Sequence, residues 1–305
     1  MKTAVKISYF SMLTLILAAS CMLISASGCA PKKDSAGGSA AALYKSGDII
    51  VTNAGSDAVL VLTPDGDFKN VLFDVDNTSE TVTGVSYLST GEILVVVEGT
   101  DRIVAVNNTG VSRNFVTHAQ YTGNVYGVTQ LASGDILAVE TNNVERFDLT
   151  GSRVSTGGWP LALQSGGRSI SAISTGGFIH CSSTADVLRT YNDAGTQQAT
   201  VASGIAGTTD AFGCTSLANG NVAVAWSGTT DTVRVYDSTL TTTVASYSDI
   251  GRLAAPTGIA ERANGNILVL DSTFNYIVEL TSALAFSRII GDDVLSTPQY
   301  IMVVP

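Results

Sequence analysis

The hydrophobic residues of this chain occur in short runs separated by polar turns, and this arrangement recurs along most of its length. In residues 47–66, GDIIVTNAGSDAVLVLTPDG, two apolar runs flank a polar loop, and a tight Asp-Gly turn follows. Short apolar runs bounded by turn residues are typical of β-strands. The segment therefore predicts a β-hairpin that leads into a third strand.

Two glycines mark each copy of this pattern. The first lies in a turn that recurs about every 43 residues, the period of a propeller repeat. These turn glycines are Gly47, Gly91, Gly134, Gly176, Gly220 and Gly265. The second precedes the turn glycine and is found at Gly84, Gly127, Gly213 and Gly258, with Ser169 in its place once. One period accommodates four strands, which predicts one blade of a β-propeller per copy.

The central strands of each copy are apolar on successive residues, as in residues 93–97 and 222–226. Both faces of such a strand need cover, so the blades are expected to stack face to face. The first copy lacks an opening strand, and a surplus strand, PQYIMVVP, follows the last copy. We predict that this strand pairs inside the first blade. The predicted fold of residues 47–305 is an all-β, six-bladed β-propeller with four-stranded antiparallel blades and a closed ring.

The N-terminal residues predict export and a lipid anchor. Lys2 and Lys6 precede an apolar run from residue 7 to 24, which is the layout of a secretory signal. The sequence Ala-Ser-Gly-Cys at 26–29 is similar to a bacterial lipobox, with Cys21 as an alternative lipidated residue. We expect a signal peptide over residues 1–28, a lipid on Cys29 and a flexible tether to residue 46. An uncleaved membrane helix and ordinary signal cleavage remain alternatives.

These features predict an exported protein that is held in a bacterial cell envelope. Ala30 stands where some Gram-negative sorting rules use Asp for inner-membrane retention, so the outer membrane is preferred. The chain carries a formal net charge of −10, which disfavours nucleic acid as a partner because that affinity depends on Lys and Arg. We expect a monomer.

The segments GNILVLDS at 265–272 and NYIVEL at 275–280 resemble NHL-repeat propellers and, more distantly, gluconolactonase and streptogramin-lyase propellers. The resemblance implies the six-bladed fold and ligand binding at loops around the central channel. It does not imply one function, because this shape serves enzymes, sensors and adhesive modules.

Polar residues recur at the end of the second strand of each copy. These positions hold Asn53, Val97 followed by Glu98, Glu140, Ser182, Trp226 and Asp271. Their oxygens could bind Ca²⁺ or Mg²⁺, which prefer several oxygen ligands. The alternative is that they accept hydrogen bonds from backbone N–H groups of the following turn. The resemblance implies a central cation in related lactonases, but their first ligand has no counterpart near Gly47.

Loops between blades supply other candidates. Acidic residues occur at Asp74, Asp76, Asn77 and Glu80, at Asp210, and at Asp292 and Asp293; the first group is a weak candidate for a Ca²⁺ loop. Tyr121, Tyr126, Trp159, Arg168 and Phe212 could line a groove for peptide or glycan, or could cover gaps between blades. His118 lies in a loop and could reach a ligand, whereas His180 is predicted to be core.

Cys181 and Cys214 are predicted to be buried free thiols. Counted from the turn glycines, the two positions correspond to cross-strand partners, which share one face of a blade. In neighbouring blades the two thiols would then point the same way and could not form a disulfide.

The sequence favours a non-catalytic binding module, without a required cofactor, for a protein, peptide or glycan. The candidate ligand-binding residues are Asn53, Glu98, Glu140, Trp226, Asp271 and His118. The alternative is a hydrolase or lyase that depends on Ca²⁺ or Mg²⁺ held by Glu98, Glu140 and Asp271 at the channel mouth. Nucleophile-elbow and zinc-protease motifs are absent from the sequence.

Overall fold

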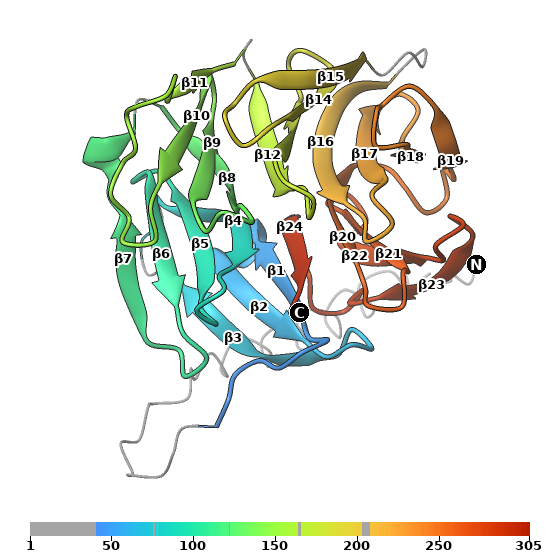
Figure 1. Ribbon diagram of the computed structural model, residues 1–305. Coiled ribbons are helices and arrows are strands. Elements are labelled where there is room, and N and C mark those ends of the chain that lie inside the picture. The colour runs from blue at the N-terminus through green and yellow to red at the C-terminus, as the bar shows by residue number, and fades with distance from the viewer. Residues whose placement is uncertain (1–40, 76, 78, 122, 164–165, 203–207) are drawn as a thin grey trace, which may run out of the picture. The chain divides into compact units, whose positions relative to one another are not determined.

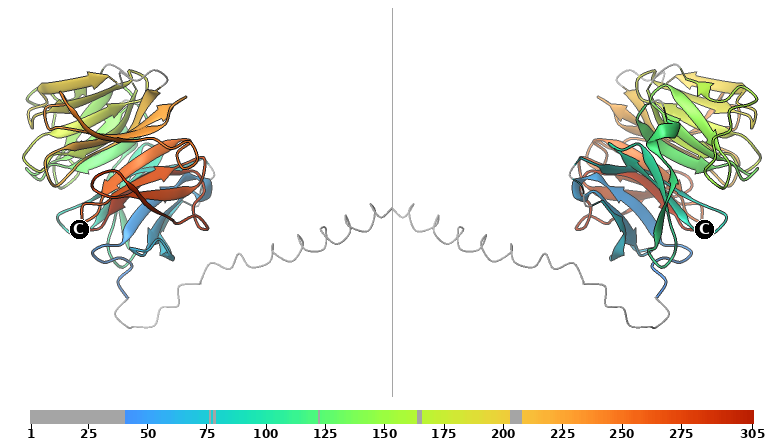
Figure 2. Two further views of the ribbon diagram at one scale, coloured as in Figure 1. Left: turned by 90° about the vertical axis from the view of Figure 1, so that its right-hand side faces the viewer. Right: turned by 90° about the vertical axis from the view of Figure 1, so that its left-hand side faces the viewer.

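The computed structural model describes residues 41–305, apart from residues 76, 78, 122, 164–165 and 203–207 (Figure 1). The predicted signal peptide, Cys29 and most of the tether lie outside the described residues. Residues 41–305 form one compact unit. Within it the prediction of six four-stranded antiparallel blades arranged in a ring is confirmed (Figures 1 and 2).

Each blade is one sheet, with its strands in chain order from the channel outwards except in the first blade. Blade 1 comprises β24 (Pro298–Val303), β1 (Ile49–Asn53), β2 (Ala58–Leu62) and β3 (Phe68–Asp74). Blade 2 comprises β4 (Thr81–Tyr87), β5 (Ile93–Glu98), β6 (Arg102–Val106) and β7 (Ser112–Val116). Blade 3 comprises β8 (Val125–Gln130), β9 (Ile136–Glu140), β10 (Asn143–Phe147) and β11 (Leu161–Ala162).

The second half of the ring repeats this order. Blade 4 comprises β12 (Gly167–Ala172), β13 (Phe178–Ser182), β14 (Val187–Tyr191) and β15 (Gln197–Ala202). Blade 5 comprises β16 (Thr208–Ser216), β17 (Val222–Gly228), β18 (Thr232–Tyr236) and β19 (Thr243–Tyr247). Blade 6 comprises β20 (Pro256–Glu261), β21 (Ile267–Asp271), β22 (Tyr276–Leu280) and β23 (Phe286–Ile290). Two 3₁₀ turns, η1 (Ala54–Ser56) and η2 (His118–Gln120), lie in loops.

Stacking of blades buries both faces of the second strands. Every residue of β1, β9, β13 and β21 is buried, as the successive apolar positions predict. One hydrophobic cluster fills each gap; that between blades 1 and 6 combines Ile49 and Val51 with Leu268, Leu270 and Ile301. Each blade therefore depends on its neighbours for a core, and a closed ring leaves no blade face uncovered.

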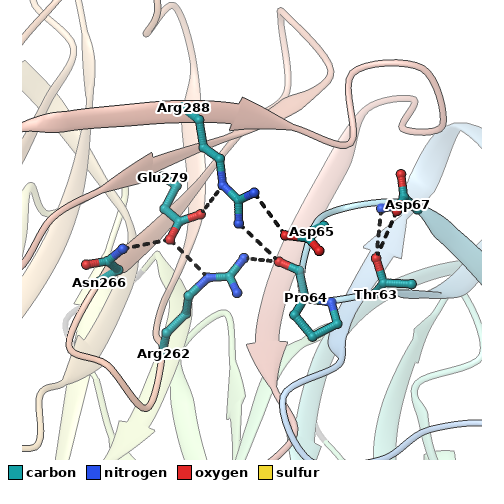
Figure 3. Close-up of polar contacts among 8 residues, drawn as sticks. All are labelled: Thr63, Pro64, Asp65, Asp67, Arg262, Asn266, Glu279 and Arg288. Atoms are coloured by element: carbon teal, nitrogen blue, oxygen red, sulfur yellow. Dashed lines mark hydrogen bonds and ion pairs between the residues drawn. The ribbon is translucent and has the colours of Figure 1, made fainter.

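The surplus C-terminal strand closes the ring, as predicted. β24 pairs antiparallel with β1, and Ile301 lies opposite Val51. Polar contacts across the seam reinforce this pairing (Figure 3). An Arg288 Nη1 atom lies 3.0 Å from Asp65 Oδ1, and Arg262 Nη2 donates to the Pro64 carbonyl at 2.6 Å. The last complete blade is thus joined to the first by side chains as well as by strand pairing.

Antiparallel pairing divides the connections between two faces of the ring. Tight turns that follow the first and third strands of each blade lie on one face, which we call the turn face. Connections that follow the second and fourth strands lie on the opposite face, the loop face. The turn glycines have positive φ, as at Gly91 with φ +87°, and Gly91 N–H donates to the Leu88 carbonyl at 2.9 Å. Glycine is favoured because other residues are strained there.

The second recurrent glycine has a different role. A Cβ atom built on Gly84 would lie 2.7 Å from the Tyr126 carbonyl oxygen of the next blade. Likewise, a Cβ on Gly213 would lie 2.2 Å from the Thr257 carbonyl oxygen. First strands converge around the channel, so a side chain at these positions would push neighbouring blades apart.

The folded unit begins ahead of the first turn glycine. Tyr44 is 2% exposed and joins the hydrophobic cluster between blades 1 and 2, with Leu43 packed against it. The part of the tether nearest the propeller is therefore packed. Over the residues that the structure describes, none of the helical segments has the length and hydrophobicity needed to cross a bilayer.

Cys181 and Cys214 are free and buried, as predicted, but the predicted orientation was wrong. Cys214 pairs with Val224, whereas Cys181 pairs with Ser169, so the two residues differ by one position in register. A shift of one residue reverses the face of the blade to which a side chain points. Both thiols consequently enter the cluster between blades 4 and 5, where their side chains are hydrogen-bonded to each other. Burial raises the pKa of the Cys181 thiol.

Candidate functional site

Two of the predicted site residues accept hydrogen bonds from backbone N–H groups of loops in their own blades. Asp271 is fully buried; its Oδ2 accepts from Ala254 N–H at 2.7 Å and from Ala255 N–H at 3.0 Å. Its Oδ1 accepts from the N–H groups of Thr273 at 3.0 Å and Phe274 at 2.8 Å. Asn53 Oδ1 accepts from Ser296 N–H at 2.6 Å. Asp271 thus accepts from the turn that follows it, as the alternative interpretation predicts, whereas Asn53 accepts from the loop before β24.

The equivalent residues of the other blades also face inward, with one exception. Glu140 and Trp226 are 1% and 0% exposed. Ser182 Oγ accepts from Ala185 N–H at 3.0 Å, in a turn of the same kind. Glu98 is half-buried, and Asn124 Nδ2 donates to it at 3.3 Å. Of this set, Glu98 is the residue that lines an open pocket on the loop face.

That pocket, which we call the acidic pocket, has a volume of about 390 Å³ and lies between blades 1 and 2. It is lined by Asp57, Ser79, Glu80, Thr81, Glu98, Gly99 and Asn124. Glu80 forms an ion pair with Arg102 at 3.0 Å, whereas Asp57 and Glu98 form no ion pair among the residues that the structure describes. The pocket therefore presents two uncompensated carboxylates at its wall.

Sequence reasoning missed Asp57, although a signal for it exists. Asp57 has φ +50°, and the corresponding residues of three other blades, Asp101, Asp186 and Asn275, have φ of +46°, +52° and +59°. Asn and Asp are the non-glycine residues that best tolerate this conformation. A second recurrent Asx position in the loops between second and third strands could thus have been recognised from the sequence.

A second feature of the loop face, the channel-mouth cluster, is formed by residues of the first strands of the blades. The Arg168 guanidinium carbon lies 4.8 Å from the Tyr126 ring centre and 5.5 Å from that of Phe212. Tyr300 OH donates to the Arg168 carbonyl oxygen. Together with Thr83, Thr257 and Gln299, these residues enclose a space of only about 10 Å³. The channel is therefore nearly closed by side chains at the loop face.

Towards the turn face the channel is open. A cavity of about 280 Å³ is lined there by the first strands of the blades, including Ser86, Thr129, Ser171, Ser216 and Glu261. Thr129 Oγ1 accepts from Ala172 N–H at 3.1 Å. The cavity is thus lined largely by hydroxyl groups and holds one carboxylate.

The remaining aromatic candidates cover gaps between blades. Tyr121 is 8% exposed and packs edge-on against Phe147, with ring centres 5.6 Å apart. Trp159 is 5% exposed and lies 6.2 Å from the Phe178 ring. The five aromatic and cationic candidates thus divide between two roles, and Tyr126, Arg168 and Phe212 are the ones brought together at the channel mouth.

Two other carboxylates of the loop face have raised pKa values. Burial and the neighbouring Asp186 raise the pKa of Asp210, although Arg168 opposes the shift. Burial also raises the pKa of Asp231, which accepts from Gly228 N–H at 3.2 Å. Asp292 and Asp293 are exposed in the loop after β23. A cation bound at this face would relieve repulsion among these groups.

Metal and acid–base chemistry receive little support from the described residues. Within them, no group of three or more His, Cys, Asp and Glu side chains has an arrangement that could hold a metal ion. Asp76 lies outside the described residues, so the candidate Ca²⁺ loop is untested. His180 is fully buried, and burial lowers its pKa to about 3, with Arg189 adding to the shift. His118 is the first residue of η2, in the connection between blades 2 and 3.

Comparisons with known proteins support the fold. The chain matches no family model and no curated protein. Among solved structures it is similar to a chain of a nidogen/laminin complex, with a TM-score of 0.68 and 12% identity over 85% of this chain and 98% of that chain. It is also similar to a Bacteroides caccae protein of unknown function, with a TM-score of 0.64 and 16% identity over 85% of this chain and 99% of that one.

A third similar structure is virginiamycin B lyase from Staphylococcus aureus, with a TM-score of 0.60 and 15% identity. The match covers 80% of this chain and 81% of the lyase. The expected distant likeness to streptogramin-lyase propellers is confirmed at the level of fold. Identities this low carry no information about ligand or activity, and the likeness to NHL repeats stays a prediction.

Proposed function

We propose that this protein is a lipid-anchored component of a bacterial cell envelope that binds a basic protein segment or peptide on its loop face without catalysis. The observation that carries the proposal is the acidic pocket. Asp57 and Glu98 line it without an ion-pair partner among the described residues, and its volume is about 390 Å³. Because its carboxylates do not form a metal-binding group within the described chain, the pocket suits an extended cation such as a Lys or Arg side chain.

The channel-mouth cluster supports the same class of ligand. Tyr126 and Phe212 place two aromatic rings at the channel mouth on the same face of the ring, and aromatic residues are enriched at the centres of protein interfaces. Other carboxylates of the loop face, the half-buried Asp210 and the exposed Asp292 and Asp293, would speed encounter with a cationic partner. A neutral glycan would make no use of this charge.

The binding proposal is tested with a fluorescent nona-arginine peptide as the probe and the full-length protein in detergent. We expect the double variant Asp57→Asn/Glu98→Gln to weaken binding at least tenfold, because each removed charge lies at the contact. The control is Asp65→Asn/Asp67→Asn, which changes net charge equally but alters the turn face. Equal weakening by both variants, or no measurable binding by the unaltered protein, would contradict a local site.

The lipid anchor is a separate part of the proposal. It is supported by the lipobox-like residues 26–29 and the signal-like residues before them. Growth with an alkyne-bearing palmitate analogue should label the protein, and Cys29→Ser should abolish the label while Cys21→Ser keeps it. Fractionation should recover the labelled protein with the outer membrane. Labelling that persists in Cys29→Ser would contradict the assignment.

A further inference from the structure

The chain enters the propeller at the turn face. Leu43 N–H donates to the Asn108 carbonyl at 2.9 Å, and Tyr44 OH donates to the Gly91 carbonyl at 2.6 Å. Asn108 lies in the turn between β6 and β7, and Gly91 lies in the turn between β4 and β5. Asn70 Nδ2 donates to the Leu43 carbonyl at 2.9 Å. In Figure 2 this first segment, in blue, lies at the lower edge of the propeller.

Exposed apolar side chains form a ring on the same face, which we call the apolar rim. They lie in or next to the turns between third and fourth strands and are 38% to 58% exposed. The members are Phe68, Val111, Leu149, Val244 and Phe286. They come from five different blades, so they are spread around the circumference. A peptide would reach one or two of them, whereas a broad flat surface would meet them all.

Charged groups on the turn face are largely paired with one another. Asp48 lies 2.6 Å from Lys69 Nζ, and Glu92 lies 2.8 Å from Arg113 Nη2. Further pairs join Asp135 to Arg146, Glu145 to Arg153, Glu279 to Arg262 and Arg288, and Asp65 to Arg288. Paired charges present a weaker net field than the uncompensated carboxylates of the loop face. An anionic lipid surface would therefore repel the loop face more strongly than the turn face.

We propose that the turn face rests on the lipid surface to which the chain is anchored, with the apolar rim in the interfacial region and the loop face directed away. This inference rests on the proposed lipid on Cys29. If residues 29–43 act as the tether that the sequence predicts, a chain of this length would span on average about 20 Å. That is close to the height of a blade built from strands of five to seven residues, about 17 to 23 Å. Inverting the ring would stretch the tether and withdraw the apolar rim from lipid.

The test measures the depth of single fluorescent labels on the full-length lipidated protein in vesicles of phosphatidylethanolamine and phosphatidylglycerol. Val244→Cys reports on the turn face, in a different blade from the one beside the tether, and Ile250→Cys reports on the loop face. Cys181 and Cys214 are 0% and 4% exposed, so they should not take up the label. We expect quenching by doxyl-labelled lipid to be at least fivefold stronger at residue 244 than at residue 250. Equal quenching at the two sites, or stronger quenching at residue 250, overturns the inference.

A second variant distinguishes quenching caused by contact of the apolar rim with lipid from quenching caused by the tether alone. Phe68→Ser/Phe286→Ser, combined with the label at residue 244, should reduce quenching by half or more, and unchanged quenching would overturn contact by the apolar rim. Palmitate labelling of each preparation identifies failure of the anchor. Protein that carries no lipid and does not float with vesicles overturns the lipid attachment and, with it, this inference, whereas lipidated protein with equal quenching overturns the orientation alone.

Discussion

The turn face and the loop face of the ring are built from the same repeats but differ in how their charges are balanced. On the turn face, Glu279 contacts the guanidinium groups of Arg262 and Arg288 within the last blade, and these two arginines contact Pro64 and Asp65 of the first blade (Figure 3). On the loop face, Asp57 and Glu98 line a pocket without ion-pair partners among the described residues. Short turns of nearly constant length favour repeated pairings, whereas loops of varying length do not.

This difference indicates where function and stability reside. Groups whose interactions are satisfied within the molecule have little free energy to gain from a ligand. Groups left uncompensated are stabilised by binding a partner of opposite charge. The distinction is not absolute, because Asp271 lies at the loop face and yet accepts hydrogen bonds from four backbone N–H groups inside the fold.

Removal of the Asp271 carboxylate should give the largest effect. Asp271→Ala leaves four backbone N–H groups without their acceptor in a buried site, and we expect a loss of about 4 kcal/mol in unfolding free energy. Urea unfolding followed by circular dichroism measures this loss. Asp271→Asn keeps one acceptor oxygen and should lose less. Asp231→Ala, at a half-buried carboxylate, should cost about 1 kcal/mol. A loss below 1 kcal/mol for Asp271→Ala would show that it is not a structural group.

A tight turn of the turn face can be probed at a single glycine. Gly66 has φ +94°, and a Cβ atom there would lie 2.5 Å from Ile290 Cβ of blade 6. Gly66→Ala should therefore combine backbone strain with a clash at the ring seam and cost about 3 kcal/mol. Gly220→Ala is the matched control, because Gly220 has φ +84° but open space around its Cβ position. It should cost about 1 kcal/mol from strain alone. Equal decreases in melting temperature for the two variants would show that a Cβ atom at residue 66 does not clash with Ile290.

Much of the fold could be predicted from the sequence because the repeat records local requirements. Positive φ at each turn demands glycine, and the close approach of first strands demands it again at positions such as Gly84. The missing first strand and the surplus last strand predict ring closure. These features depend on spacing along the chain, which a sequence displays directly.

The candidate site was less predictable, because its residues come from different blades that become neighbours only in the folded ring. Asp57 and Glu98 come from different blades and meet only when the ring forms. The cysteine error has a different origin, in the register assumed for the tight turn. The residue six before a turn glycine pairs with the residue four after it, as Val85 with Val95 and Cys214 with Val224, so the position of Cys181, five after its glycine, is not the partner position. Among the aromatic candidates, Tyr121 and Trp159 are buried between blades and do not belong to the channel-mouth cluster. Their burial arises only when the blades assemble into the ring.

Ion pairs within the turn face should differ in strength according to burial. Glu279 is nearly buried between Arg262 and Arg288, at 3.4 and 2.8 Å. Glu279→Gln should cost about 2 kcal/mol, because it removes the counter-charge of Arg262 and leaves Arg288 paired with Asp65 alone. Glu92→Gln removes the partner of Arg113 in a more exposed pair and should cost about 0.5 kcal/mol. Adding 1 M NaCl should reduce the stability cost of Glu92→Gln by a larger fraction than that of Glu279→Gln, because salt screens exposed charges more effectively. Equal costs for the two variants would show that burial does not distinguish these pairs.

The smallest effect, and the most direct comparison of the faces, is the order in which their aspartates titrate. On the turn face, a side-chain hydrogen bond from Thr150 and backbone N–H groups lower the pKa of Asp148. Partial desolvation opposes the shift at Asp237, but hydrogen bonds from Thr241 and Thr239 lower its pKa to about 2. On the loop face, the pKa values of Asp210 and Asp231 are raised above 3.8, first by burial. Carboxyl ¹³C NMR should therefore show Asp210 and Asp231 taking up protons before Asp148 and Asp237 as pH falls.

The signs of the stability changes follow from these directions. A lowered folded-state pKa gives stability that is present above the unfolded value near 3.8 and is lost as pH falls towards about 2, as for Asp237. A raised folded-state pKa gives stability that is fully present below the unfolded value and is lost as pH rises through the folded value, as for Asp231. Asp231→Asn should remove the loss of stability as pH rises and keep the loss as pH falls towards 2. Asp237→Asn should remove the loss at low pH and keep the loss as pH rises. Identical pH dependence of unfolding in the two variants would mean that the faces do not differ in charge balance.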